Sequence, residues 1–223
     1  MIPRTLSATE ARVLSVLVEK QHTVPDSYPL SLNALTAGCN QKTAREPVMN
    51  LSEADVLQAL AGLKELTLAH EVHGSRVVRF DHNAAKGLGV PSQAVALLTT
   101  LMLRGPLTAA ELRLHCERLH KFADISSVEG FLDELAEKSP PRVVKLPKAP
   151  GSREHRWAHL LCGEPQLPAE TASSSASTGI DAAQWQQLLS EHADLQQQVQ
   201  QLRATVQFLA KELGVSIDDL PSP

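Results

Sequence analysis

Apolar residues recur at spacings of three and four along two separate stretches of the chain, and the same order of segments appears in both. In residues 6–81, and again in residues 91–160, three apolar runs are followed by two short segments around a Gly-bearing turn. Spacings of three and four predict amphipathic helices, and paired short segments around such a turn predict a β-hairpin. The pattern therefore predicts three helices closed by a hairpin, in two copies.

Residues suited to helix capping stand at the starts of these runs. Ser7 and Glu10 have the spacing of a capping box before the first run, and Ser92 opens the corresponding run of the second copy. The second helices start at Ser31 and Thr108. Since a hydroxyl oxygen can accept a backbone N–H of the first turn, these positions predict where the helices begin.

Three helices and a hairpin make a winged helix-turn-helix. We therefore expect a mainly α chain with small β-hairpins, of the α+β class, that contains two tandem winged helix-turn-helix domains. The first domain is predicted over residues 1–84 and the second over residues 88–162. At 223 residues, the chain has the length for two small domains and an additional segment.

The remaining residues predict a linker and a C-terminal coiled-coil helix. Residues 163–180 contain almost no bulky apolar side chain, which predicts a flexible linker. Residues 181–214 repeat apolar side chains at alternating spacings of three and four, which predicts a coiled coil and a homodimer. A single amphipathic helix packed on the globular part, or a heterodimer, is the alternative. The residues predicted to form the dimerisation seam are Leu188, His192, Leu195, Val199, Leu202, Val206, Leu209 and Leu213.

Charge is unevenly distributed along the chain. The net charge is −4, but residues 164–223 hold 2 Lys and Arg against 8 Asp and Glu, whereas residues 86–163 hold 11 against 8. The acidity therefore lies in the tail, and the second copy of the repeat is mildly basic.

Cysteine spacing and hydropathy limit the class of protein. Cys39, Cys116 and Cys162 are odd in number and widely spaced, so they predict buried reduced thiols rather than a disulfide framework or a zinc ribbon. The sequence has no stretch of about 18 consecutive apolar residues, and its first residues lack the apolar region of a signal peptide. We expect a cytoplasmic protein with no membrane partner.

One loop distinguishes the first copy from the second. Residues 37–52 separate the second and third helices of the first copy, whereas the second copy has only a few residues around Phe122 at this point. A structural role is one interpretation, with Asn40 as a cap of the second helix and Asn50 or Ser52 as the cap of the third. The other is a loop that binds phosphate or a partner's backbone. The side chains that would do so are Asn40, Gln41, Lys42, Thr43 and Arg45.

Several segments resemble the YceH-like family of bacterial proteins. They comprise residues 14–21, 28–33, 39–43, 45–52, 103–105 and 150–157. The resemblance covers the repeat and is specific because its middle block is long. It implies two winged-helix domains and an unassigned biochemical role, and it supplies no catalytic or binding residues. The linker and the coiled coil lie outside it.

Winged-helix domains usually bind DNA, and the second copy carries a suitable set of basic residues. We expect DNA binding with phosphate contacts led by the second hairpin, which would suit a transcriptional regulator. An ordinary solvated surface is the alternative. The candidate DNA-binding residues are Lys145, Lys148, Arg153 and Arg156 in the second hairpin, with Arg113, Arg118 and Lys121 in the second helix nearby.

The third helices favour a different partner. Their sequences begin or continue with carboxylates, such as Glu53, Asp55, Glu129 and Asp133, which repel DNA phosphates. The alternative function is therefore a protein–protein interaction adaptor, in which the winged-helix grooves and acidic third helices receive another chain. Fold alone does not decide between the two.

No catalytic or metal site is predicted. Cys116 with His120, and His155 with His159, could each place two metal ligands on one face, but two ligands do not make a site. The sequence contains no nucleophile elbow, phosphate-binding loop or HExxH motif. We expect a protein that is not an enzyme and that uses no cofactor and no metal.

Overall fold

The computed structural model describes residues 4–73, 77–148 and 154–165, together with the single positions 197, 200, 201 and 206. Helices predominate, and the strands form small antiparallel sheets. The chain divides into two compact units, residues 1–167 and residues 168–223. The predicted linker and coiled coil lie almost wholly outside the described residues. Of the predicted seam only Val206 is described; it is helical and about half exposed.

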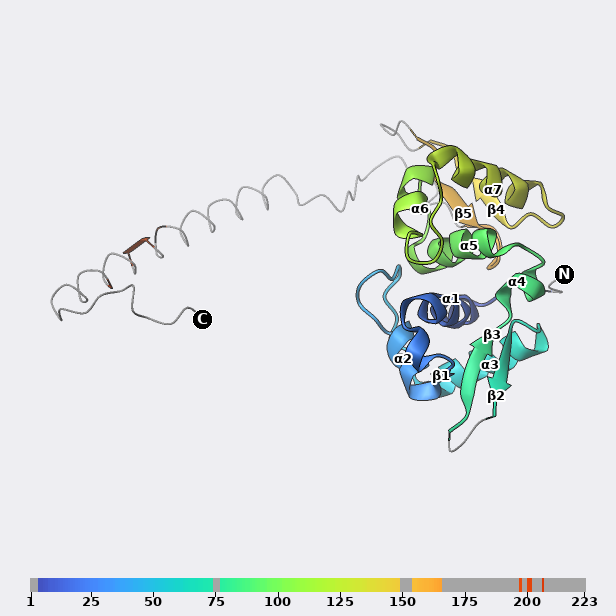
Figure 1. Ribbon diagram of the computed structural model, residues 1–223, viewed down its shortest axis with the longest axis vertical. Coiled ribbons are helices and arrows are strands. Elements are labelled where there is room, and N and C mark those ends of the chain that lie inside the picture. The colour runs from blue at the N-terminus through green and yellow to red at the C-terminus, as the bar shows by residue number, and fades with distance from the viewer. Residues whose placement is uncertain are drawn as a thin grey trace, which may run out of the picture. The chain divides into compact units, whose positions relative to one another are not determined.

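The first half of the 1–167 unit consists of three helices and a three-stranded sheet (Figure 1). The helices are α1 (Ala8–Thr23), α2 (Leu32–Cys39) and α3 (Glu53–Glu65), with a short 3-10 turn, η1 (Pro25–Ser27), after α1. The strands are β1 (Leu30–Ser31), β2 (Ala69–Val72) and β3 (Arg79–His82). All pairs are antiparallel, and β3 lies between β1 and β2.

The second half repeats this order after a short connecting helix, α4 (Ala84–Leu88), which lies at the junction of the two predicted domains. Its helices are α5 (Ser92–Arg104), α6 (Ala109–His115) and α7 (Ile125–Glu137), and its strands are β4 (Val143–Lys145) and β5 (Trp157–His159). Strand β5 pairs with β4 and also forms an isolated bridge to Leu107.

Equivalent positions in the two halves can be assigned from the helix caps. Ser31 and Thr108 both accept an N–H of the first turn through the side chain, and eight residues after each of them stands a fully buried cysteine, Cys39 or Cys116. Ser52 and Asp124 cap α3 and α7 in the same way, each in a capping box. The repeat therefore extends from the sequence pattern to individual core positions.

The strand pairs also lie at equivalent positions in the two halves. Leu30 pairs with Phe80 in the first half, and Leu107 pairs with Trp157 in the second. Phe80 also stands opposite Glu71 of β2, as Trp157 stands opposite Lys145 of β4. The strand β1 of the first half is thus reduced to a single bridge in the second.

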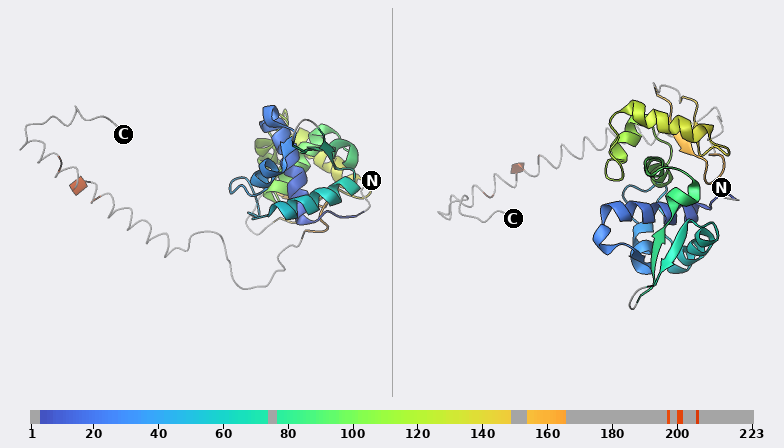
Figure 2. Two further views of the ribbon diagram at one scale, coloured as in Figure 1. Left: turned by 90° about the horizontal axis from the view of Figure 1, so that it is seen from below. Right: turned by 45° about the vertical axis from the view of Figure 1, so that its right-hand side comes forward.

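Helices α1 and α5 pack against each other and join the two halves (Figures 1 and 2). Residues Glu10–Val18 of α1 and Ala94–Leu103 of α5 are all buried, so neither helix keeps a polar face along its middle. A helix that is buried all round lies within a core rather than on its surface. The buried residues of the two halves accordingly form one continuous cluster.

The ends of the 1–167 unit also meet. The backbone N–H of Leu6, before α1, donates to the carbonyl of Leu161, after β5, at 2.7 Å. The Sγ of Cys162 lies 3.8 Å from the carbonyl oxygen of Ser7.

The local predictions need some correction. Pro91, not Ser92, is the N-cap of α5, and it offers no side-chain hydrogen bond because proline has no polar side chain. Ser92 is the first helical residue, and its Oγ contacts Gln93 instead.

Candidate interaction surfaces

The first candidate surface is an apolar groove between α2, α3 and the β2–β3 hairpin. It has a volume of about 690 Å³. Its apolar walls come from Leu32 at the start of α2, Leu57 on α3, and Val77, Val78 and Phe80 at the start of and within β3. We call it the first groove. Figure 1 shows α3 beside the β2–β3 hairpin at the outer end of this half.

Three large apolar side chains of the first groove are exposed. Leu57 is 46% exposed, Val77 56% and Val78 43%. Single exposed apolar residues are ordinary on protein surfaces, but a contiguous group that lines a concavity usually marks an interaction site. The hydrophobic stripe of α3 that faces the core is Val56, Leu60 and Leu63, so Leu57 points away from the core.

Three charged side chains border the first groove. Glu71 forms an ion pair with Lys64 at 2.7 Å, and the hydrogen bond from Lys64 lowers the pKa of Glu71. Arg79 donates to the carbonyls of Ser27 at 3.1 Å and Pro29 at 2.7 Å. Glu53 is exposed in the first turn of α3.

The second half has a groove at the equivalent position, with a volume of about 270 Å³. We call it the second groove. Its lining residues are Ala109, Ala110, Ile125, Glu129, Lys145, Glu154, His155 and Trp157. By the caps and strand pairs above, these eight positions correspond to Leu32, Asn33, Glu53, Leu57, Glu71, Val77, Val78 and Phe80 of the first groove.

The two grooves therefore share a framework and differ in chemistry. Val77 and Val78 of the first groove are replaced by Glu154 and His155 in the second. Ile125 stands where the first groove has Glu53, and the acidic Glu71 is replaced by Lys145. The first groove is mainly apolar with acidic residues at its border, whereas the second is of mixed charge.

Several candidate DNA-binding residues make contacts within the second half. Lys145 lies over the ring of Trp157, with Nζ 5.3 Å from the ring centre, which is a cation–π contact. Arg113 donates to the carbonyl of Ala123 at 3.1 Å. Arg156 donates to the carbonyl of Pro106 at 3.2 Å and lies 3.9 Å from Glu111.

Arg156 also has a counterpart in the first half. Arg79 and Arg156 each immediately precede the central aromatic residue of their hairpin, and each donates to the carbonyl of a proline that precedes the paired leucine. A contact that recurs in both halves serves the common framework. We therefore assign Arg156 a structural role in fixing the hairpin.

The remaining basic candidates are exposed. Arg118 and Lys121 lie in the α6–α7 connection, and Lys148 follows β4. Arg153 lies outside the described residues. The six of these basic residues that the structure describes lie in two segments: α6 with the connection after it, and the second hairpin.

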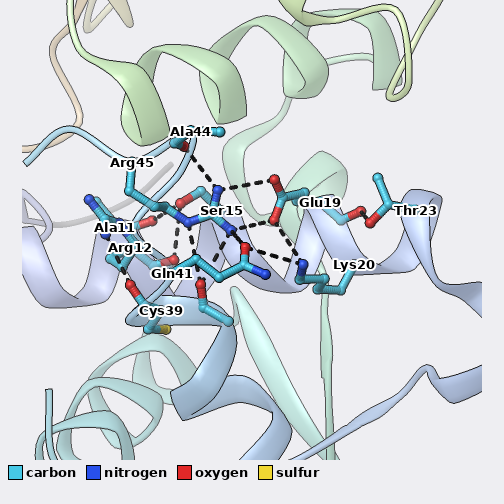
Figure 3. Close-up of polar contacts among 11 residues, drawn as sticks. Ala11, Arg12, Ser15, Glu19, Lys20, Thr23, Cys39, Gln41, Ala44 and Arg45 are labelled. Carbon is cyan, nitrogen blue, oxygen red and sulfur yellow. Dashed lines mark hydrogen bonds and ion pairs between the residues drawn. The ribbon is translucent and has the colours of Figure 1, made fainter. Parts of the chain in front are cut away.

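The loop between α2 and α3 is held from within (Figure 3). Arg45 is 4% exposed and donates from Nη1 and Nη2 to the two carboxylate oxygens of Glu19 on α1. It also donates to the carbonyls of Gly38 and Ala44 and to Oε1 of Gln41. These bonds fix the loop to α1 and to the end of α2.

Further bonds complete the attachment of this loop. The side-chain amide of Asn40 both donates to the carbonyl of Leu51, at 2.8 Å, and accepts from its N–H, at 2.7 Å. The backbone N–H of Glu46 donates to the carbonyl of Leu103 at the end of α5, at 2.7 Å. Of the five candidate loop residues, Lys42 and Thr43 are the exposed ones. The loop therefore connects the first half to the second.

The buried thiols and histidines have shifted pKa values that arise from burial. Desolvation raises the pKa of Cys39 to about 12 and that of Cys116 to about 11, which disfavours the reactive thiolate. Desolvation also lowers the pKa of His159 to about 4. Within the described ranges, no three His, Cys, Asp or Glu residues are grouped so as to hold a metal ion. Among the same residues, no helix has the length and apolar character needed to cross a bilayer.

Winged-helix grooves were expected from the sequence, but the apolar residues that line the first groove were not identified, because they read as parts of regular elements. The signal was nevertheless present. Leu57 follows Val56 directly, so the two cannot share the helix face that Val56, Leu60 and Leu63 define. Val77 and Val78 are likewise two consecutive apolar residues next to the predicted turn, before the first paired strand residue, Arg79.

Comparison with known proteins gives the family of the chain. The family described as "Protein of unknown function, DUF480" matches residues 6–152. A UPF0502 protein of Leptothrix cholodnii is 62% identical over 218 residues, which cover 96% of this chain and 98% of that protein. A UPF0502 protein of Burkholderia pseudomallei strain 668 is 60% identical over 217 residues, which cover 97% of this chain and 93% of that protein. These matches agree with the resemblance to an uncharacterised bacterial family and extend into the C-terminal tail.

Proposed function

The chain belongs to the bacterial DUF480 family, whose description assigns no function, and we propose that it is a non-enzymatic adaptor that binds a segment of another protein in its first groove. In this proposal each half of the 1–167 unit is a winged helix-turn-helix. The three helices and the hairpin of each half, with a strand or bridge at Leu30 and Leu107, support that assignment.

The observation that carries the proposal is the apolar lining of the first groove. Leu57, Val77 and Val78 are exposed together on the surface where a DNA-binding winged helix would carry polar and basic side chains. Grooves beside a helix, with apolar walls and a few charged groups, are a common form of peptide-binding site. Burial of these side chains by a partner would supply affinity that does not depend on phosphate.

The exposed surfaces of the third helices support a protein rather than DNA. On α7 the exposed charged residues are all acidic, namely Glu129, Asp133, Glu134 and Glu137. On α3 the exposed Glu53, Asp55 and Glu65 outnumber Lys64, which is paired with Glu71. Neutralisation of phosphates is the main source of DNA affinity, so acidic third helices are poorly suited to the major groove.

The proposal is tested by affinity capture from a cell extract with matched variants. The bait is the full-length protein, compared with Leu57→Asp in the first groove and Val48→Asp in the α2–α3 loop. Val48 is 56% exposed and does not line the groove, so it controls for a new charge at an exposed apolar position. We expect a stoichiometric protein partner that survives high salt and nuclease, is kept by Val48→Asp and is lost by Leu57→Asp. The same capture by both variants would refute the proposal.

DNA binding by the second half is the second candidate function. The exposed Arg118, Lys121 and Lys148 and the basic balance of residues 86–163 favour it. If it is correct, changing Lys148 and Arg153 together to Glu should abolish a salt-sensitive mobility shift on genomic DNA fragments. An unchanged shift would show that the second hairpin does not contact DNA.

We also propose that the protein is a homodimer through a coiled coil formed by residues 181–214. The regular apolar spacing in this segment supports it. The relatives above align over nearly the whole chain, so the tail is not peculiar to this sequence.

A further inference from the structure

Charge in the first groove indicates what kind of segment it binds. Two carboxylates and one guanidinium border the apolar walls, and two of these three groups are already satisfied. Glu71 is paired with Lys64, and Arg79 donates to two backbone carbonyls. Glu53 has no hydrogen bond or ion pair to any other residue among those that the structure describes.

Glu53 is placed to act together with Leu57. The two residues are four apart on α3, so their side chains lie on the same face of the helix, and both line the groove. A segment that covers Leu57 would therefore bring its own side chains next to Glu53. A carboxylate that is partly desolvated by a bound apolar segment is stabilised only if an opposite charge comes with that segment.

The acid at this position is not required by the helix itself. Near the N-terminus of a helix, a carboxylate is stabilised by the helix dipole, so Glu53 does contribute to α3. The equivalent residue of α7 is Ile125, and α7 begins in the same kind of capping box without an acid there. Asp55 in α3 supplies the capping-box carboxylate.

The second groove carries different charges at the equivalent positions. Its position equivalent to Leu57 carries Glu129, and its position equivalent to Glu71 carries Lys145. The two grooves therefore present different charge patterns on one framework. The first has three exposed large apolar side chains, Leu57, Val77 and Val78, whereas the second has Ile125 and adds Lys145 and His155 to its carboxylates.

From these observations we infer that the first groove binds a protein segment with large apolar side chains and a basic side chain, and that Glu53 pairs with the basic one. The inference rests on the proposed adaptor function. The apolar side chains cover Leu57, Val77 and Val78, and the Lys or Arg reaches Glu53 with Glu71 nearby. The pair sets which segment is chosen, while the apolar contact supplies most of the affinity.

The test is selection of peptides from a phage-displayed library of random peptides on the immobilised full-length protein. Wild type, Glu53→Lys and Leu57→Asp are used in parallel, with Glu65→Lys as the control for charge reversal at an exposed site on the same helix. Circular dichroism and melting temperature establish that each variant is folded.

We expect wild type and Glu65→Lys to select peptides that combine large apolar residues with Lys or Arg. Glu53→Lys should select apolar peptides enriched in Asp or Glu instead, and Leu57→Asp should bind the wild-type peptides at least tenfold more weakly. In Glu53→Gln, affinity for the wild-type peptides should fall severalfold and lose much of its salt dependence.

Each contrary outcome is separable. If Glu53→Lys selects the same peptides as wild type while Leu57→Asp still loses them, the charge inference fails and the adaptor function stands. If Leu57→Asp selects the same peptides as wild type, both the charge inference and the adaptor function fail. Both also fail if wild type enriches no peptide relative to Leu57→Asp. Loss of self-association in Leu57→Asp by light scattering would assign the groove to a second copy of this chain and overturn the inference.

Discussion

Gly62 of α3 lies against the carboxylate of Glu10 of α1 so closely that a Cβ at Gly62 would stand 2.0 Å from Oε1 of Glu10. Glu10 is buried, accepts the backbone N–H of Ser7 and pairs with Arg4. It thus closes the capping box of α1 and contacts α3. A glycine in the interior of a helix, normally unfavourable, is explained here by the space that this carboxylate occupies.

Replacing Gly62 by Ala should therefore destabilise the protein. Alanine favours the helix by about 1 kcal/mol, but displacing a buried carboxylate from its cap and its ion pair outweighs that gain. We expect a net loss of about 1 kcal/mol in the free energy of unfolding, measured by urea denaturation.

Gly130 provides the control for this prediction. It lies inside α7, and a Cβ there would meet nothing within 4 Å. Gly130→Ala should raise the free energy of unfolding by about 0.5–1 kcal/mol. Shifts of the same sign in the two variants would show that contact with Glu10 does not decide the effect at Gly62.

Arg45→Ala should be strongly destabilising. The side chain is fully buried and forms its ion pair with Glu19, of which 18% of the side chain is exposed. Removing the guanidinium releases the α2–α3 loop and leaves Glu19 with the weaker contact to Lys20 at 3.6 Å. We expect a loss of about 2–4 kcal/mol on urea denaturation, since breaking a buried pair leaves an uncompensated charge.

Lys42→Ala is the matched change for Arg45→Ala. Lys42 lies in the same loop and is exposed, so its replacement should alter stability by less than about 0.5 kcal/mol. Equal effects of the two changes would contradict the role of Arg45 in attaching the loop.

His159 should make the fold sensitive to mild acid. Burial lowers its pKa from 6.5 to about 4, so between these values the unfolded chain binds a proton that the folded chain does not. Above pH 6.5 this histidine does not change the free energy of unfolding with pH. As the pH falls from 6.5 towards 4, protonation of the unfolded chain lowers the free energy of unfolding by up to about 3 kcal/mol. Chemical denaturation between pH 4 and 8 measures it.

A variant separates His159 from the other titrating groups. His159→Leu should flatten the pH dependence of the free energy of unfolding relative to wild type. His22→Gln, at an exposed position, should keep the wild-type dependence. The partly buried His82, whose pKa is also lowered by desolvation, is kept in His159→Leu and cancels in the comparison of that variant with wild type. Parallel curves for His159→Leu and wild type would exclude His159 as the source.

If residues 181–214 form the proposed coiled coil, the mass of the protein in solution should depend on this segment. Light scattering should give a dimer for the full chain and a monomer for a chain ending at Leu167, where the first compact unit ends. Leu202→Asp in the predicted seam should also give a monomer, and Gln200→Asp, beside the seam, should not. If all four proteins have the mass of a monomer, the tail is no dimerisation element.

Sequence patterns were sufficient for the helices α1–α3 and α5–α7 and for the two hairpins, but not for η1, β1, α4 or the surfaces. Helix caps at Ser7, Ser31 and Thr108 and the core spacing of α3 and α7 depend on residues close in sequence, so the helices could be located. The isolated bridge between Leu107 and Trp157 joins residues 50 apart and left no local sign.

The loop and the grooves were harder to interpret for the same physical reason. Arg45 reads as a polar loop residue until Glu19, 26 positions earlier, is placed beside it. From the sequence, Arg156 was a candidate DNA contact. In the structure it donates to a proline carbonyl, as the equivalent Arg79 does. Burial and partnership of a charged side chain are tertiary properties, so composition alone assigned these residues to a free surface.

The hydrogen bond between Leu6 and Leu161 brings residues near the beginning and the end of the 1–167 unit into contact. New ends could therefore be opened elsewhere and the old ones joined by a short bridge, as circular permutation requires. It also means that segments attached before Leu6 and after Leu161 start from neighbouring points of the fold.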